Sequence, residues 1–433
     1  MALTTLTAGS ASSRSGYTAG TSNLDGNLKN RYGDLHKLVV KQFAFQRKAA
    51  FRTSKQVGNA FKETALLQNE HGVTYAGPED DAYQLRTPIA GKTQEVSVQG
   101  SQHILRAHVG INAVRASATN EQAFASVFDL VTENSTDSLR KRIEIDMFYG
   151  QVGLGTVAGI SSDTITITTA HFAAGIWAGA EGAVIELFDE DGSGDLDPTD
   201  KHEGGSENHT ITNVDIEARQ ITVDTIASDA DVGDHIVFAG MVDTTWLTQL
   251  GLHAIAGGPT TLFGITTANF SLWNPAQYSA GSGALTFEKV NKASVRAINR
   301  GFAGDMTLMV NPSTWADMLN DEAALRRDSK RGSGQIDVGH DGITFHTAAG
   351  TVNILSSIYV REGSAYLIPS DGQASYKRIG VTDVTMSPLG KGESFIERVP
   401  DYAAYEMLFV DIQALYCSRP GYTVRIDNIV NAS

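Results

Sequence analysis

The chain has 433 residues, enough for about three compact units, and hydrophobic residues make up 41% of it, so each unit can bury a sizeable core. Its single cysteine, Cys417, excludes an intrachain disulfide, which is typical of folding in a reducing cytoplasm, and a lone cysteine is usually a small buried side chain. No apolar run approaches the ~18 residues of a membrane span, and we expect neither a membrane segment nor a secretory signal.

Charge is spread unevenly along a chain whose formal net charge is -15. Residues 1–60 carry nine Lys and Arg against two acidic residues, whereas residues 186–235 carry fifteen Asp and Glu against two basic residues. The chain therefore has a basic beginning and an acidic middle, which suit different partners or form two solvated faces.

The first two segments are a predicted arm and a predicted basic helix. Residues 1–34 are small and polar without periodicity, so we expect an extended arm. Asp34 can cap a following helix, which we predict over residues 35–56 and which would be cationic.

Residues 57–118 change to an extended pattern. Val96 and Val98 alternate with polar residues, and turn signals stand at Gly72 and Gly100. We predict a long β-hairpin excursion with little core of its own.

Residues 119–151 carry the longest helical signal of the chain. Thr119 offers a cap with Gln122 three residues on, and Gly150 ends the pattern. The apolar residues between them recur at helical spacing: Phe124, Val127, Phe128, Val131, Leu139, Ile143 and Met147. A helix of about thirty residues would be a rod of roughly 45 Å.

Residues 152–243 are predicted to form an inserted β-rich domain. Thr164 to Thr168 alternates cleanly, and further short strands are expected near residues 183–188, 209–214, 220–226 and 235–238. An antiparallel barrel or a sandwich fits this pattern.

The last part of the chain combines helix and strand. After a connecting segment, residues 244–285, we predict an α/β unit over residues 286–400 that begins with a helix capped by Thr286. Residues 401–433 contain a closing strand from Ala404 to Cys417, longer than most strands. The fold class is therefore α+β.

One acidic loop in the insert resembles a calcium-binding loop. Over the twelve residues 189–200, oxygen side chains fall at loop positions 1, 3, 5, 9 and 12, and Gly194 stands at position 6, where the loop turns sharply. The candidate ligands are Asp189, Asp191, Ser193, Asp195, Asp197 and Asp200. Strands and not helices flank the loop, and position 12 is Asp instead of the usual Glu, so a solvated hairpin tip is the alternative to a possible calcium site.

We find no catalytic constellation in the sequence. Gly91-Lys92-Thr93 resembles the end of a phosphate-binding loop, but Arg86 occupies the position that needs a glycine. No nucleophile elbow and no metal-binding histidine pair occurs. We therefore expect no enzyme activity and no required cofactor.

The order of these parts resembles the major capsid proteins of tailed bacteriophages, which have the Johnson (Hong Kong 97-type) fold. That family has an N-arm, an extended loop, a spine helix and peripheral domain, and an axial domain. Particular stretches are similar to the branch with a β-rich insertion: Gly251 to Asn269, Trp273-Asn274-Pro275, Leu285-Thr286-Phe287, Met309 to Trp315, and the insert boundaries Gly155-Thr156-Val157 and Val232-Gly233-Asp234.

This resemblance implies a virion protein that self-assembles as hexamers and pentamers into an icosahedral shell around double-stranded DNA, after assembly in the host bacterial cytoplasm. The implied partners are further copies of the chain and scaffolding, portal and possibly cement proteins, with no membrane. The basic N-terminal region would be mainly a structural arm, with non-specific contact with packaged DNA as the alternative role.

Two other functions remain open on the sequence. A calcium-dependent β-module of a phage tail or surface protein would explain the insert but not the long helix. An encapsulin-like compartment shell protein would share the fold, and its particles would lack a tail and DNA.

Overall fold

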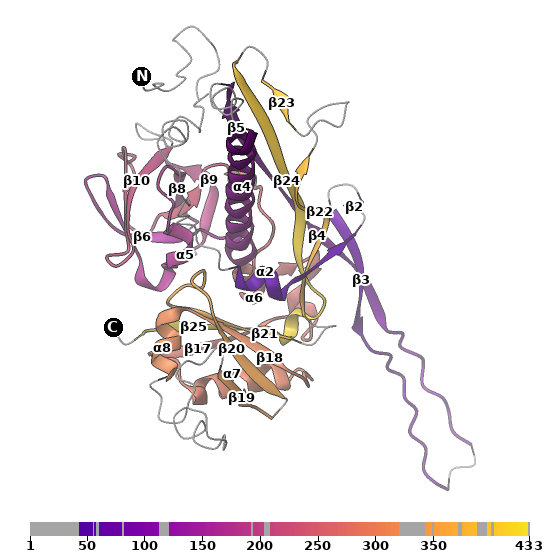
Figure 1. Ribbon diagram of the computed structural model, residues 1–433. Helices are drawn as coiled ribbons and strands as arrows, with labels where there is room; N and C mark the ends of the chain where they lie inside the picture. The colour runs from indigo at the N-terminus through magenta and orange to yellow at the C-terminus, as the bar shows by residue number, and fades with distance from the viewer. Residues whose placement is uncertain are drawn as a thin grey trace, which may run out of the picture. The chain divides into compact units, whose positions relative to one another are not determined.

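A computed structural model describes residues 43–54, 56–57, 60–79, 82–111, 121–191, 194–202, 208–319, 343–348, 350–370, 375–387, 396–399 and 402–431 (Figure 1). The chain divides into two units that are each built from segments far apart in sequence. Unit 1 comprises residues 1–43, 102–143 and 381–413, and unit 2 comprises residues 44–101, 144–380 and 414–433. The predicted arm, residues 1–34, lies outside the described residues.

Unit 1 contains most of a long helix and the first part of a long strand. Helix α4 runs over Glu121–Tyr149 and gives its last turns to unit 2, and strand β24 runs over Ala404–Cys417. Both elements are confirmed, and β24 has the predicted bounds. Strand β24 pairs with β5 (Ser101–Gly110) and, in antiparallel register, with β23 (Glu397–Arg398).

Unit 2 begins with a short helix and a parallel strand where the sequence predicted one basic helix over residues 35–56. Helix α2 covers only Ala44–Lys48, and β1 (Ala50–Thr53) pairs in parallel with the start of β22 (Tyr376–Ser387). The prediction was wrong for residues 50–53, because hydrogen bonds to a strand over 300 residues away override local helix propensity. Residues 35–42 lie outside the described part of the chain.

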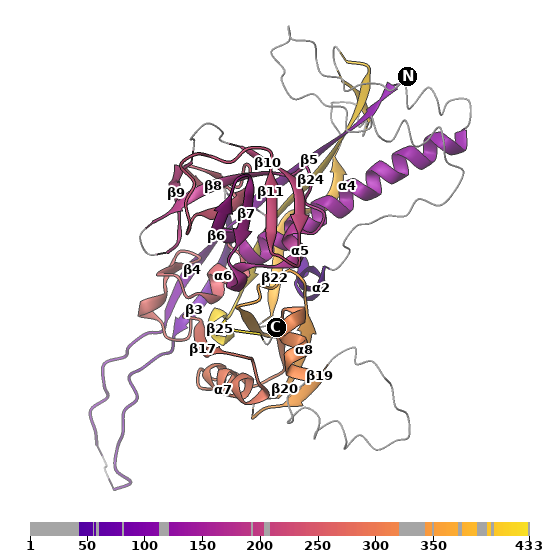
Figure 2. The ribbon, with the colours of Figure 1, turned by 90° about the vertical axis from the view of Figure 1, so that its left-hand side faces the viewer.

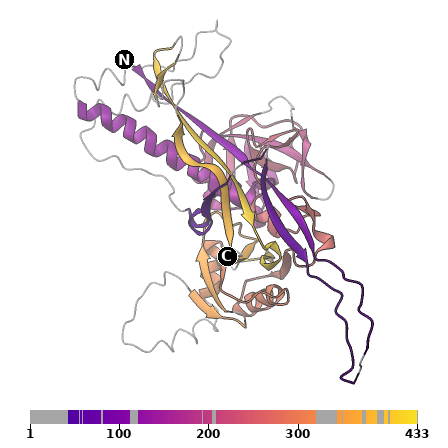
Figure 3. The same ribbon diagram turned by 90° about the vertical axis from the view of Figure 1, so that its right-hand side faces the viewer.

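A long hairpin follows, formed by β3 (Ala60–Gln68) and β4 (Lys92–Gln99), with β2 (Gln56–Val57) on the other side of β3 (Figures 1 and 3). The excursion predicted over residues 57–118 is therefore shorter than expected. Residues 102–110 were assigned wrongly, because β5 pairs with β24 and these residues belong to unit 1.

The insert is an antiparallel barrel, which decides between the two predicted architectures (Figure 2). Six strands close the ring in the order β10-β11-β7-β6-β12-β8, because β10 pairs with both β11 and β8, and β9 extends the sheet beyond β8. Trp177 is fully buried and lies against Phe238, with 5.8 Å between their ring centroids. The elements are β6 (Gly155–Ser161), β7 (Thr164–Ile167), η1 (Thr169–His171), α5 (Ala174–Trp177), β8 (Val184–Glu190), β9 (Leu196–Lys201), β10 (His209–Asp215), β11 (Gln220–Val223) and β12 (His235–Phe238).

Unit 2 also holds a six-stranded mixed sheet in the order β17-β25-β21-β18-β20-β19. Helix α7 (Phe287–Ile298) packs on it with Phe287, Val290 and other buried residues at helical spacing, and its predicted cap is confirmed because Thr286 accepts a hydrogen bond from the Lys289 N–H. The other elements are β17 (Ala276–Gly283), β18 (Met306–Val310), α8 (Pro312–Leu319), β19 (Ile343–His346), β20 (Thr351–Ser356), β21 (Ala365–Pro369) and β25 (Val424–Ile429).

This sheet corrects the predicted limits of the α/β unit. Strand β17 comes from the predicted connecting segment, residues 244–285, and β25 from the predicted closing segment, residues 401–433. Strands β22 and β23, predicted within residues 286–400, are not part of it. Non-local pairing sets these limits, and local sequence patterns do not report it.

Short elements complete unit 2 between the barrel and the sheet. They are β13 (Val242–Asp243), β14 (Thr245–Trp246), α6 (Leu252–Ala256), β15 (Thr261–Leu262), β16 (Ile265–Thr266), η2 (Thr267–Asn269) and, near the C-terminus, η3 (Pro420–Tyr422). Cys417 is fully buried, as predicted.

Candidate assembly surfaces

The hairpin of β3 and β4, together with its distal loop, exposes large apolar side chains. Tyr75 is 86% exposed and Leu85 is 74% exposed, which is unusual for residues of their size. The exposed apolar residues of the hairpin are Leu66, Val73, Tyr75, Tyr83, Leu85 and Ile89, and we call this set the apolar tip.

The base of the same hairpin is anchored in unit 2. Phe61, Val96 and Val98 are buried, and the Ser97 N–H donates to the Phe263 carbonyl at 3.0 Å. Further out, in the described part of the distal loop, one bridge joins the backbones of His71 and Ile89. The hairpin is thus fixed at its base, while its distal part presents apolar side chains and backbone groups to solvent.

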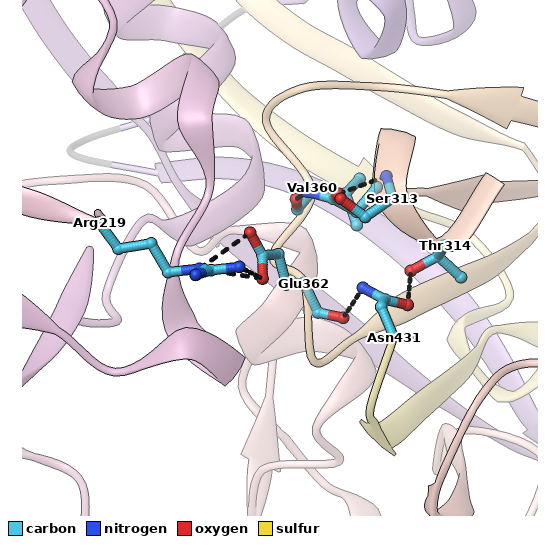
Figure 4. A network of polar contacts seen from close by, with 7 residues as sticks. Arg219, Ser313, Thr314, Val360, Glu362 and Asn431 are labelled. Atoms are coloured by element: carbon cyan, nitrogen blue, oxygen red, sulfur yellow. Dashed lines mark hydrogen bonds and ion pairs between the residues drawn. The ribbon is translucent and has the colours of Figure 1, made fainter. Parts of the chain in front are cut away.

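Residues 357–363, between β20 and β21, form what we call the junction loop, because it joins the barrel, the end of α4 and the six-stranded sheet. On the barrel side, the Arg219 guanidinium makes a bidentate pair with the Glu362 carboxylate, with Nη2 to Oε2 at 2.9 Å and Nε to both oxygens at 3.2 Å (Figure 4). Backbone bonds reinforce this contact: Gly175 N–H to Ile358 O at 2.9 Å, Glu362 N–H to Phe172 O at 3.0 Å and Gly363 N–H to Ala170 O at 3.0 Å.

The junction loop also contacts the last turn of α4. The Tyr149 hydroxyl donates to the Tyr359 carbonyl at 2.8 Å and accepts the Arg361 N–H at 2.9 Å. Burial raises the pKa of Tyr149 to about 12, so the hydroxyl keeps its proton and remains a donor. The Arg361 guanidinium lies over the Tyr149 ring, 4.4 Å from its centroid, and donates to the Gly153 carbonyl.

On the sheet side, the junction loop is bound through two asparagines. Asn311 Nδ2 donates to the Val360 carbonyl at 2.7 Å, and Asn431 Nδ2 donates to the Glu362 carbonyl at 3.4 Å (Figure 4). Thr314 in α8 donates to Asn431 Oδ1 at 2.9 Å. One loop therefore sets the orientation of the barrel against the sheet within unit 2.

In unit 1, β5 and β24 are joined by charged side chains. Arg106 makes a bidentate pair with Glu406, at 2.9 and 2.8 Å, and His108 Nε2 lies 3.2 Å from the same carboxylate. The hydrogen bonds from Arg106 lower the pKa of Glu406. His103 Nδ1 lies 3.2 Å from Asp411, which is fully buried. These pairs fix the register of the two strands.

The predicted calcium loop is the β8–β9 hairpin, and its residues are only partly brought together. Asp191 and Asp195 face each other, with the Asp191 N–H bonded to the Asp195 carbonyl at 2.7 Å, whereas Asp197 and Asp200 lie along β9. The Asp197 carboxylate accepts the Thr199 hydroxyl and N–H, and these two bonds lower its pKa.

The other two candidate ligands are Asp189 and Ser193. Asp189 accepts the N–H of Glu190 at 2.8 Å, and Ser193 lies outside the described residues. Across the part of the chain that the structure describes, no three His, Cys, Asp or Glu side chains group as metal ligands. The calcium site stays a prediction.

The basic residues near the start of the chain are only partly within the described residues. Of the basic residues in the first 60, Arg52 pairs with Glu63 at 3.2 Å inside the chain, and those before residue 43 lie outside the described part. No described helix is both long enough and apolar enough to cross a bilayer.

No known protein family matches the sequence, and no curated protein matches it. A chain of the cyanophage A-1(L) capsid asymmetric unit matches in structure with a TM-score of 0.53, over 92% of this chain and 95% of that chain, at 14% identity. This chain has the fold of that phage capsid protein. A chain of the cyanophage P-SCSP1u capsid has a TM-score of 0.46 at 10% identity, over 93% of this chain and 92% of that chain. A chain of the SrpI encapsulin complex from Synechococcus elongatus has a TM-score of 0.42 at 8% identity, over 92% of each chain.

Helix α4 lies in the segment predicted as the spine helix, and the apolar tip lies in the segment predicted as the extended loop. Sequence reasoning missed the junction loop and the role of Glu144 described below. Both depend on side chains that meet across large sequence separations. Arg361, an arginine between Val360 and Glu362 just before a strongly apolar strand, was the one local signal of a buried charge.

Proposed function

We propose that this chain is the major capsid protein of a tailed bacteriophage, which self-assembles into the icosahedral shell that encloses the double-stranded DNA genome. The observation that carries the proposal is the capsid fold, matched over nearly the whole length of both chains. Within it, the apolar tip is the surface that most needs a neighbour.

The apolar tip supports assembly with further copies of the chain. Six large apolar side chains on one hairpin would be unfavourable in water and would promote aggregation if left uncovered. A second copy is the partner available at the required concentration, and repetition around closed symmetry would cover every tip. Each fully covered side chain of this size adds about 1.5–3 kcal/mol.

The remaining parts of the proposal follow from a shell role. We expect hexamers and pentamers of the chain, a location in the virion, assembly in the host cytoplasm, and scaffolding, portal and possibly cement partners. Contact with DNA would be non-specific, because a shell must accept any sequence. No catalytic activity is expected.

The test is negative-stain electron microscopy of the purified full chain and of two matched variants. The wild-type protein should form closed shells. Tyr75→Ser with Leu85→Ser should fold with an unchanged melting temperature, since both side chains are exposed, but should give at least tenfold fewer closed particles. Val232→Ser, which changes a 68% exposed residue of the barrel domain, is the control and should assemble normally.

Two outcomes would contradict the proposal. Normal shells from the double variant would mean that the apolar tip is not an inter-subunit contact. A wild-type chain that stays monomeric under all conditions would contradict the capsid role. Shells without a tail that hold a protein cargo instead of DNA would also contradict it and would favour a compartment shell.

A further inference from the structure

Helix α2 is held at both of its ends by charged side chains of unit 2. The Glu144 carboxylate accepts the Phe45 N–H at 2.8 Å and the Gln46 N–H at 3.0 Å. At the other end, Arg378 Nε donates to the Ala49 carbonyl at 3.1 Å. These bonds give partners to backbone groups at both ends of this short helix.

The packing around α2 closes Glu144 off from water. Phe45 is fully buried, with its ring centroid 5.0 Å from that of Phe148 and 5.8 Å from that of Tyr376. Glu144 itself has no exposed surface. Opening α2 would therefore remove both N–H donors and expose the carboxyl group to water.

Burial and the neighbouring groups act in opposite directions on the pKa of Glu144. Burial raises its pKa from 4.5 to about 7, against the two N–H bonds and the positive charges of Arg378 and Arg47, which lower it. Tyr359 from the junction loop also faces it and stays neutral, because burial raises the pKa of its hydroxyl well above the usual value. Glu144 is thus the titrating member of the group near neutral pH.

We propose that Glu144 is a proton-operated latch: its protonation state controls how firmly α2, the short helix that follows residues 1–43, is held in unit 2. The latch is closed most firmly when Glu144 carries its proton and is loosened when the buried carboxyl ionises. The inference concerns the single folded chain and goes beyond the proposed capsid function.

The direction follows from linkage. The pKa of Glu144 is about 7 with α2 closed and, once the carboxyl is in water, returns to the ordinary value of 4.5. The open form therefore binds fewer protons between these values, and raising the pH favours opening. With these two values, the opening equilibrium should rise about tenfold between pH 6 and pH 8.

The experiment is hydrogen exchange at the Phe45 and Gln46 amides of the full-length chain, kept unassembled, from pH 5.5 to pH 8.5. The control is Glu144→Gln, which keeps an oxygen acceptor but does not ionise, and the ratio of the two rates at each pH removes the chemical pH dependence of exchange. The ratio of wild-type to variant rate should rise about tenfold between pH 6 and pH 8.

A ratio that is constant across this range overturns the latch. If Glu144→Gln does not fold, the Val290 amide, which donates to the Thr286 carbonyl in α7, serves as the reference within the wild-type protein. Phe45 and Gln46 must then lose protection relative to Val290 as the pH rises, and equal behaviour of the three amides also refutes the proposal.

Discussion

At the scale of single residues, Arg219 combines an uncommon backbone conformation with an ion pair. Its backbone is left-handed, with φ of 56°, in the turn between β10 and β11, and its side chain makes the bidentate pair with Glu362. A non-glycine residue in this region is strained unless tertiary contacts hold it. The ion pair to the junction loop supplies such a contact, and it also ties the barrel to the sheet.

A double-mutant cycle measures this tie. Arg219→Asn should destabilise the chain by about 1–2 kcal/mol, because asparagine tolerates the left-handed backbone and only the ion pair is lost. Arg219 is partly exposed, so solvent screening keeps the value at this modest level. Glu362→Gln should cost a similar amount, and the double variant little more than either. Additive losses, measured by thermal or chemical unfolding, would show that the two side chains do not act as a pair.

At the scale of elements, the β8–β9 hairpin still carries the calcium prediction. Clustered carboxylates repel one another, so a bound cation would order the hairpin and stabilise the fold by mass action. Wild-type protein should melt a few degrees higher in calcium than in chelator, and Asp189→Ala with Asp191→Ala should abolish that difference. Glu217→Ala, an exposed acidic residue on another turn of the barrel domain, should keep it. Identical wild-type melting curves with and without calcium would remove the site.

The elements also show how far the sequence could lead. Strands with strict alternation or continuous apolar runs, such as β7, β12 and β24, were predicted within a residue or two, and the Thr286 cap was predicted correctly. These signals are local, since periodicity and capping involve residues within one turn or one strand. The long helix α4 was found for the same reason.

The assignments that failed depend on contacts between distant residues. Strand β1 was predicted as helix because its partner, β22, lies more than 300 residues away. The place of β17 and β25 in one sheet, and the bonds of the junction loop, likewise leave no local trace. The latch could not be predicted, because the burial of Glu144 depends on where α2 packs.

At the scale of the whole molecule, the buried histidines set an acid limit on stability. Burial, helped by the positive charge of Arg361, lowers the pKa of His171 to about 3 and that of His253 well below its ordinary value. Both are neutral in the folded chain, whereas in the unfolded chain they take up protons as the pH falls through 6.5. The contribution of these two histidines to the free energy of unfolding is therefore fully present above pH 6.5 and is lost as the pH falls toward 3. Glu144 acts in the opposite direction, since its raised pKa adds stability as the pH falls from about 7 to 4.5.

This balance gives a prediction for acid unfolding. His171→Asn keeps a polar atom near Nδ1, which lies 2.9 Å from the Thr156 hydroxyl, but removes the titration. Between pH 7 and pH 5, the free energy of unfolding of the variant should fall by about 1–2 kcal/mol less than that of the wild type. Melting temperatures across this range check the difference, and parallel profiles would mean that His171 does not contribute to acid unfolding.

The interleaving of the two units has a consequence for synthesis. Strand β24 supplies unit 1 with the partner of β5, and β25 lies between β17 and β21 in the sheet of unit 2, yet both strands fall within the last thirty residues. Neither sheet can close until its strand, β24 or β25, has left the ribosome. Folding must then join segments separated by hundreds of residues, which is slow. Chains that end before β24 therefore lack a strand of each sheet, and translation through β25 becomes a check on every copy of the chain that folds.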